Sequence, residues 1–175
     1  MATVTAGAPH FTYGTYEQAL AMIGSTSEVR FADVEVNWAM IRQYCGLVED
    51  ANPTYWDGDY ATSRHGGMIA PPGMLQVWMM RAQWKPGGVE PGPSLADSIP
   101  LPGDTLINVG TEAEFLRPVR VGDVLSVVDE VTAITPEKTT RLGRGHFVTT
   151  VATYRNQRGE VVARNTNQLF RFTKA

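Results

Sequence analysis

Four strand-like segments follow one another in the C-terminal part of the chain, and they constrain its fold most. They are residues 105–115, 123–133, 141–154 and 160–173. In the first, apolar Ile107, Val109, Ala113 and Phe115 alternate with polar residues, which predicts one face turned inward and one toward solvent. Turn residues separate the segments, at 118–123, 135–138 and 156–159. Consecutive strands joined by short turns predict an antiparallel sheet.

The residues before this sheet are predicted to contain two main helices. After Asn37, a good helix cap, the apolar residues Trp38, Ile41, Cys45 and Val48 recur at helical spacing. They predict a helix that ends near residue 49 and buries one stripe. Residues 74–82 are apolar on nearly all sides, which predicts a buried helix with the sheet wrapped around it. This order of elements is typical of an α+β fold.

Shorter segments complete the outline. Residues 16–23 predict a short helix closed by Gly24, and residues 27–35 predict a first strand. Residues 85–104 are rich in proline and glycine and predict a long loop, which in a compact domain is often functional. Residues 1–12 are expected to form a loose N-terminal arm.

Composition predicts one domain across residues 1–175, because a chain of this length with 43% hydrophobic residues can bury one sizeable core. The net charge of -3 argues against nucleic acid or an anionic membrane as the main partner. The chain has no basic start followed by an apolar run, so a cytoplasmic location is expected. Its one cysteine, Cys45, is best interpreted as a small buried apolar residue.

One motif carries most of the functional information. It comprises Asp50, Asn52, Pro53, Ala61 and the run Gly73-Met74-Leu75. Their spacing resembles the signature of the MaoC-like (R)-specific enoyl-CoA hydratases. In that family the Asp and a His five residues later share the attacking water, and backbone N–H groups at the helix start polarise the thioester carbonyl. Here Tyr55 occupies the His position, and Glu49 stands where the family usually has Gly.

This combination is similar to the dehydratase N-terminal subgroup, which is related to the dehydratase region of fungal fatty acid synthase. Such chains commonly work beside a second hot-dog unit that holds the intact Asp/His pair. The resemblance covers residue 34 to the C-terminus, including the strand-turn-strand segment 114–123. It implies a single hot-dog fold, an acyl-CoA substrate with a long or bulky acyl group such as a steroid side chain, and no cofactor.

The chemistry of the motif predicts that this chain supplies no catalytic residue. A tyrosine side chain has a pKa of about 10 and is a poor base at neutral pH. Pro71 and Pro72 have no backbone N–H, which removes two possible donors to the thioester oxygen. A role in substrate binding is predicted instead for seven residues: Asp50, Asn52, Tyr55, His65, Gly73, Met74 and Trp78.

Five of these seven residues have a purely structural alternative. Asp50 and Asn52 can form a turn in which their side chains bind nearby backbone. His65 can be a displaced base or a hydrogen-bonded loop residue, and Met74 and Trp78 can be core residues or line an acyl pocket. No set of His, Cys and carboxylate residues has metal-ligand spacing, so no metal site is expected.

The leading hypothesis is a subunit of a heteromeric enoyl-CoA hydratase or dehydratase, in which the partner supplies the Asp and His. A second is a self-sufficient homodimeric hydratase in which Asp50 works with His65 or Tyr55. A third is a non-catalytic hot-dog protein that binds acyl thioesters. A hot-dog thioesterase is disfavoured, because residues 74–82 contain no carboxylate where its central helix would carry one.

Overall fold

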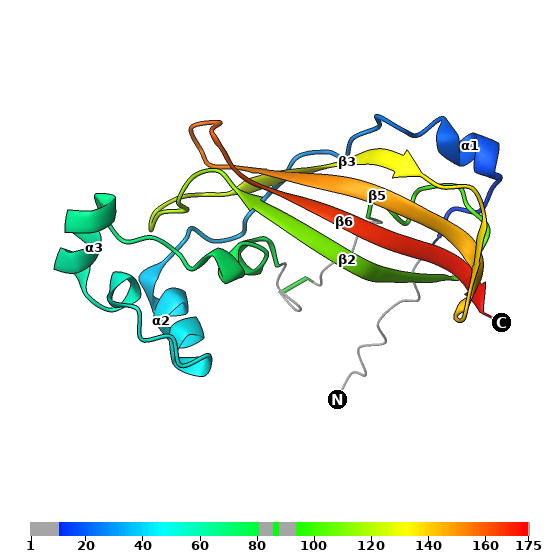
Figure 1. The fold of residues 1–175 in the computed structure, drawn as a ribbon. Coiled ribbons are helices and arrows are strands. Elements are labelled where there is room, and N and C mark those ends of the chain that lie inside the picture. Colours follow the sequence, from blue (N-terminus) through cyan, green and yellow to red (C-terminus); the bar gives the residue numbers. More distant parts are fainter. Residues whose placement is uncertain (1–10, 81–85, 88–93, 175) are drawn as a thin grey trace.

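The computed structural model describes residues 11–80, 86–87 and 94–174, which form an antiparallel sheet accompanied by short helices (Figure 1). The strands are β1 (Arg30–Phe31), β2 (Thr105–Phe115), β3 (Ser126–Ile134), β4 (Lys138–Thr140), β5 (Gly143–Arg155) and β6 (Val161–Lys174). Their order is β1-β3-β5-β6-β2, and β4 pairs with β5. The four predicted C-terminal strands are confirmed, and the predicted bounds of β2 match the observed ones. The α+β class is confirmed with them.

Three α-helices accompany the sheet: α1 (Tyr16–Leu20), α2 (Trp38–Leu47) and α3 (Gly58–His65). The Asn37 side chain accepts a hydrogen bond from the Met40 N–H at 3.0 Å, which confirms the predicted cap of α2. Ile41 and Cys45 are fully buried, whereas Trp38 and Val48 are largely exposed, so the buried stripe is narrower than predicted. Helices α2 and α3 lie near one end of the sheet and α1 near the other (Figure 1).

The buried helix predicted over residues 74–82 is wrong in form. Two 3₁₀ turns, η2 (Pro72–Met74) and η3 (Val77–Met79), occupy its start, and residues 81 and 82 lie outside the described part. Met80 is extended, with φ -70° and ψ 124°. The helical path therefore ends before Met80, which is exposed.

Two core clusters lie along the inside of the sheet. The larger packs α2 and the 3₁₀ turns against the strands and contains Ile41, Met74 and Trp78. The smaller lies around α1 and contains Ala19 and Ile99. Ile99 is fully buried, so the end of the predicted long loop 85–104 belongs to the core, while residues 85 and 88–93 lie outside the described residues.

Strand β2 differs from its predicted burial pattern. It is an edge strand, and Val109 and Phe115, expected to face inward into the core, are 44% and 49% exposed. The two 3₁₀ turns are too short to cover the full length of the sheet, so its inner face at β2 is left uncovered. Strand β1 is also shorter than the predicted segment 27–35, since only Arg30 and Phe31 pair with β3.

The N-terminal arm is described only at its end. Residues 1–10 lie outside the described part, and Thr12 donates a backbone hydrogen bond to the Asp97 carbonyl at 2.9 Å. Among the helices that the structure describes, none has the length and apolar character needed to span a bilayer. Within the same residues, no group of three or more His, Cys, Asp or Glu side chains is placed to hold a metal ion.

Candidate acyl-binding site

The Asp50 carboxylate and the Asn52 amide accept hydrogen bonds from the local backbone. Asp50 Oδ1 accepts a hydrogen bond from the Asn52 N–H at 3.0 Å, and Asn52 Oδ1 accepts one from the Thr54 N–H at 3.0 Å. Asn52 thereby caps the short 3₁₀ turn η1 (Pro53–Tyr55). The structural alternative stated for these two residues accounts for both of these side-chain contacts.

Tyr55 is buried beside this turn, with 7% of its surface exposed. Burial raises the pKa of the Tyr55 phenol above its ordinary value, and the neighbouring Asp50 charge raises it further. The side chain therefore stays protonated at neutral pH. It can donate a hydrogen bond but cannot act as the base that the family's His provides.

His65 ends helix α3 and comes close to the motif from the other side. Its Nε2 lies 3.5 Å from the Thr54 hydroxyl, and its backbone carbonyl accepts a hydrogen bond from Arg120. Helix α3, capped by the Asp57 side chain, was not indicated by the sequence analysis and brings His65 to this position. Four of the predicted binding residues, Asp50, Asn52, Tyr55 and His65, thus gather near one end of the molecule.

Glu49 precedes the motif with a φ of 56°, the one positive value among the described residues other than glycine. A left-handed backbone is a position that favours glycine, which agrees with the Gly usual in the resembled family. An open hollow of about 480 Å³ borders this turn and is lined in part by Cys45, Asp50 and Trp56. The Trp56 indole donates to the Asp50 carbonyl at 2.6 Å and so closes the turn.

The Gly73-Met74-Leu75 run is fixed by tight packing. A Cβ on Gly73 would lie 2.6 Å from the Tyr44 hydroxyl, so no larger residue fits there without movement. The N–H groups of Met74 and Leu75 donate to the carbonyls of Pro71 and Pro72, and Met74 itself is buried in the core. These two N–H groups are therefore not free to polarise a thioester oxygen.

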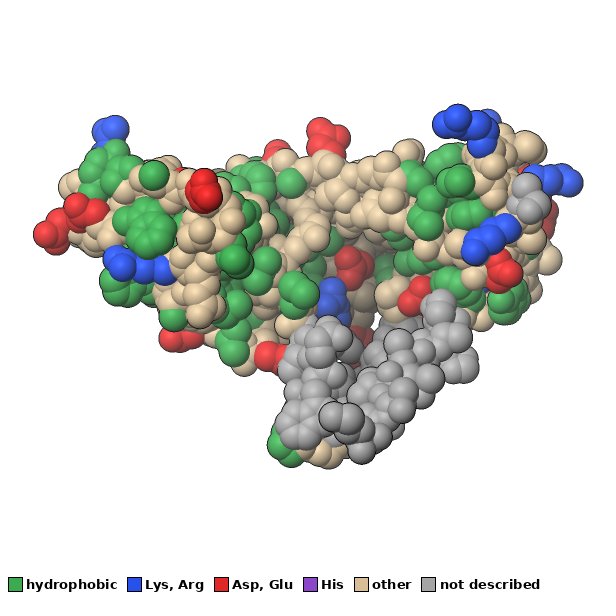
Figure 2. All heavy atoms as spheres, turned by 90° about the horizontal axis from the view of Figure 1, so that it is seen from below, with side chains coloured by type: hydrophobic (Ala, Val, Ile, Leu, Met, Phe, Trp, Pro, Cys, Tyr) green, Lys and Arg blue, Asp and Glu red, His purple; other side chains and the backbone are tan. Residues whose placement is uncertain are grey.

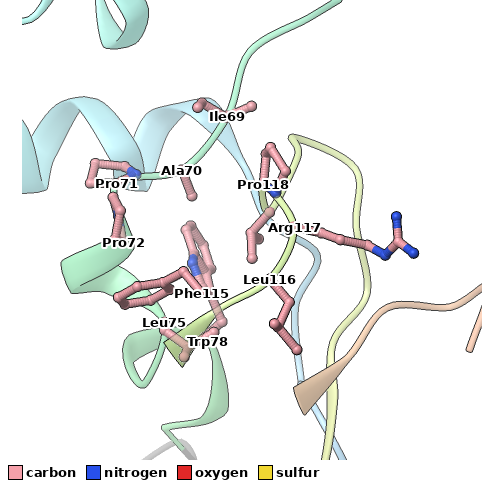
Figure 3. A pocket seen from close by; sticks show the side chains of 11 residues that line it. Ile69, Ala70, Pro71, Pro72, Leu75, Trp78, Phe115, Leu116, Arg117 and Pro118 are labelled. Carbon is pink, nitrogen blue, oxygen red and sulfur yellow. The ribbon is translucent and has the colours of Figure 1, made fainter. Parts of the chain in front are cut away.

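Trp78 lines an apolar pocket of about 290 Å³ on one side of the 3₁₀ turns. In a 3₁₀ helix residues three apart eclipse one another, so Pro72, Leu75 and Trp78 form one wall. Figure 3 shows Leu116 and Pro118 opposite, with the Arg117 guanidinium directed away from the pocket. The buried Trp78 Nε1 has no hydrogen-bond partner among the described residues.

A larger groove of about 410 Å³ lies on the other side of the turns, over the inner face of the sheet. Gln76 and Met79 form its wall on the turns, and Leu95 and Leu169 border it near the smaller core cluster. Figure 2 views the molecule from below and shows apolar side chains gathered near both ends, with fewer visible between them. The groove lies beside the two 3₁₀ turns that stand where a continuous central helix was predicted.

The floor of the groove carries linked polar side chains. Asn108 donates to the Thr111 hydroxyl at 2.9 Å, and Thr111 donates to Asn167 Oδ1 at 2.9 Å. Arg30 and Asp129 form an ion pair at 3.5 Å on the β3 side. None of these residues was predicted as a site residue. The available signal was the polar pair Asn165 and Asn167 at alternate positions of a strand, where a packed sheet would carry apolar residues.

The seven predicted site residues therefore do not meet in one cavity of the described structure. Trp78 lines the apolar pocket, Asp50 lines the open hollow, and Met74 lies in the core. The groove is lined by none of the seven. Their roles in substrate binding stay predictions.

Comparison with known protein families agrees with the motif. Residues 21–165 match the model of the FAS1-like dehydratase domain region. A probable enoyl-CoA hydratase alpha subunit of Thermomonospora curvata is 40% identical over 169 residues, which cover 90% of this chain and 52% of that protein. The 3-oxo-4,17-pregnadiene-20-carboxyl-CoA hydratase alpha subunit of Mycobacterium tuberculosis is 32% identical over 140 residues, covering 75% of this chain and 44% of that protein. The chain thus spans about half the length of these curated relatives.

A solved structure has the same fold. The crystal structure of the ChsH1-ChsH2 complex from Mycobacterium tuberculosis contains a chain that superimposes with a TM-score of 0.73 and 28% identity. The likeness covers 91% of this chain and 92% of that one. The predicted hot-dog fold is confirmed, with the difference that two 3₁₀ turns stand where the central helix was expected.

Proposed function

Because the chain belongs to the family of the FAS1-like dehydratase region, we propose that it is the pocket-forming subunit of a heteromeric enoyl-CoA hydratase. The observation that carries the proposal is the open groove of about 410 Å³ between the 3₁₀ turns and the inner face of the sheet. The groove has space for a bulky acyl group.

The motif supports the division of labour between two subunits. Hydration of a trans-2-enoyl thioester needs a base that activates water and an acid that protonates the α-carbon. In this chain Tyr55 stays protonated and cannot be that base, and the Asp50 carboxylate has no His at the position where the family pairs one with it. The partner's Asp and His perform the proton transfers, and this chain holds the acyl group in position.

The exposed edge of the sheet supports the presence of a partner. Strand β2 pairs only with β6 among the described strands, and Val109, Phe115 and Leu116 expose large apolar side chains along it. An uncovered apolar edge favours association with another sheet. Both curated relatives are described as alpha subunits, and the solved neighbour is a complex of two proteins.

The size of the groove and the relatives favour a long or bulky acyl group. The Mycobacterium tuberculosis relative is described as acting on a pregnadiene carboxyl-CoA, which is a steroid side-chain thioester. A groove of about 410 Å³ is within the range of ligand-binding cavities. We therefore propose a polycyclic or similarly bulky 2-enoyl-CoA as the substrate of the complex.

The test is reconstitution with a second hot-dog subunit that carries the intact Asp-x-Asn-Pro-x-His motif. Hydration of a bulky trans-2-enoyl-CoA is followed by loss of enoyl absorbance for this chain, the partner and the co-expressed complex. We expect activity of the complex and almost none of this chain alone, together with a heteromer in sedimentation. Full activity of the purified chain would favour the homodimeric hydratase, and no activity with any partner would favour the non-catalytic binding protein.

A further inference from the structure

The negative charge of the chain is concentrated at the end of the sheet where α2 and α3 lie. Residues 33–65 contain six Asp and Glu residues and two Arg residues, out of 18 acidic and 15 basic residues in the whole chain. The rest of the chain therefore contains 12 acidic and 13 basic residues and is close to neutral. A surface with one sign of charge favours a binding partner of the opposite sign.

Three of these carboxylates line the open hollow beside α2. Glu49, Asp50 and Asp57 border it together with apolar Pro53 and Trp56, and its volume is about 480 Å³. None of the three carboxylates forms an ion pair within the described part of the chain. The open hollow thus combines apolar lining with negative charge, which suits the aliphatic stem and cationic head of a Lys or Arg side chain.

The Arg42 side chain of α2 contacts two tryptophans and not these carboxylates. Its guanidinium lies 3.9 Å from the centre of the Trp38 ring and 5.2 Å from that of Trp56, and its Nη2 donates to the Trp56 carbonyl at 2.7 Å. These contacts hold both indoles in place, although both are exposed. Trp and Arg are among the residue types that contribute most to the stability of protein interfaces.

The exposed apolar surface continues from the open hollow to the end of α2, where Leu47 is 83% exposed and Val48 is also exposed. Strand β2 ends at Phe115, at the same end of the sheet as α2 and α3 (Figure 1). A subunit that pairs with the β2 edge passes this end of the sheet. Its loops there are the ones that can reach α2.

We infer that the open hollow is a second contact surface for the catalytic subunit and receives a Lys or Arg side chain from it. The inference rests on the proposed function, because it names the surface at which that partner is held. The β2 edge supplies an apolar contact, and the open hollow supplies a charged one that discriminates between possible hot-dog partners. Glu49, Trp56 and Asp57 then determine partner choice and take no part in the hydration chemistry.

Gly46 allows the open hollow to be filled without disturbing the chain. It lines the open hollow within α2, and a Cβ at this position would have no atom within 4 Å. Replacing a glycine inside a helix also favours the helix, so Gly46→Ala, Gly46→Leu and Gly46→Trp should fold at least as well as the original chain. Each is co-expressed with the second hot-dog subunit, and dissociation of the complex on dilution is followed by sedimentation.

The dissociation constant should rise with the size of the added side chain, by roughly tenfold for Gly46→Leu. Gly58→Leu is the matched control, because Gly58 begins α3, does not line the open hollow and likewise has no atom within 4 Å of an added Cβ. It should leave the dissociation constant unchanged. Thermal melting checks that each variant folds.

The charged part of the contact is tested by combining Glu49→Gln with Asp57→Asn. An amide oxygen at position 57 can still accept the N–H groups that cap α3, so the helix is kept. The double variant should raise the dissociation constant roughly tenfold at low ionic strength and much less at high salt, because salt screens exposed charges. Glu28→Gln, an exposed carboxylate outside residues 33–65, is the control and should have no effect.

Hydration of the enoyl-CoA by the same complexes separates the two proposals. If Gly46→Leu and the double variant left the dissociation constant unchanged while the complex still hydrated the thioester, the inference would be overturned and the proposed function would stand. If no second hot-dog subunit formed a complex with this chain, both would fail.

Discussion

The motif loop, which carries Asp50 and Asn52, and the inner face of the sheet are both rich in polar side chains. The side chains of the two regions have different hydrogen-bond partners. In the loop, the side chains of Asp50 and Asn52 each bind a backbone N–H two residues away. On the sheet, Asn108, Thr111 and Asn167 bind one another, and Asn165 keeps a buried atom without a partner in the described chain.

The backbone explains the difference. In a strand the N–H and C=O groups are paired by the neighbouring strands, so side chains remain available for other partners. In an irregular turn the N–H groups have no such partners and take up nearby carboxylate and amide oxygens. A residue that matches a motif is therefore weaker evidence of function than a side chain with unused hydrogen-bonding capacity.

The largest expected effect is on the hydration rate, and it compares the partner's catalytic His with Asp50 of this chain. Replacing the partner's catalytic His should lower hydration by the complex by roughly 10²–10⁴-fold, which is the usual contribution of one acid–base group. Asp50→Asn in this chain should change the rate less than about threefold, because the amide oxygen can still accept the Asn52 N–H. Hydration rates of the two variant complexes, measured by loss of enoyl absorbance, test this prediction.

Tyr55→Phe serves as the control for this comparison. It removes the hydroxyl and keeps the buried ring, so it should also leave turnover nearly unchanged. If Asp50→Asn abolished turnover while the partner's His could be replaced freely, the active site would belong to this chain. The proposed division between the subunits would then be wrong.

The second prediction concerns Trp78, which lies between the two regions on the 3₁₀ turns. Trp78→Ala should lower the free energy of unfolding by about 3–5 kcal/mol, because the side chain is 1% exposed and belongs to the core. Trp38→Ala is the control on the surface, where its ring contacts Arg42, and should cost only about 1 kcal/mol. Urea titration gives both values.

Acyl-chain preference distinguishes the two interpretations of Trp78. A loss of stability with unchanged preference among enoyl-CoA chain lengths would assign the residue to the core alone. A changed preference with little loss of stability would show that the apolar pocket contacts the acyl group, and the groove would then not be the whole binding site.

Much of the fold was predictable from the sequence because its signals are local. The alternation of apolar residues and the turn residues between them placed β2, β3, β5 and β6, and Asn37 placed the start of α2. The two 3₁₀ turns in place of the expected central helix were not predictable in the same way. Apolar residues at 74–80 suit a helix, but the chain forms two 3₁₀ turns there and becomes extended at Met80.

The site was predictable only in part. The motif identified the family, but spacing cannot show that the Asp50 and Asn52 side chains bind their own backbone. The groove depends on contacts between residues far apart in the chain, such as Thr111 with Asn167. Such contacts follow from the register of β2 against β6, which a single sequence does not specify.

The third prediction tests the structural role of the motif loop directly. Asn52→Ala should lower the free energy of unfolding by roughly 1 kcal/mol, because it removes the side-chain cap of η1. Hydration by the complex, measured below the unfolding transition, should stay within about twofold of the original rate. A large loss of turnover in a folded complex would instead give Asn52 a role in binding substrate.

The smallest expected effect concerns Glu49, which stands in a left-handed backbone position where the resembled family usually has Gly. A left-handed backbone costs an ordinary residue about 1–2 kcal/mol, whereas glycine loses roughly 0.5–1 kcal/mol more in conformational entropy on folding. Glu49→Gly should therefore raise the free energy of unfolding slightly, by about 0.5 kcal/mol, because the φ of Glu49 is 56°. Glu28→Gly, at an exposed position without a positive φ, should be destabilising in the same urea titration. If both changes destabilised the protein equally, the left-handed turn would not explain the glycine of the family. The sign of this small difference thus tests whether that glycine serves the shape of the loop or its chemistry.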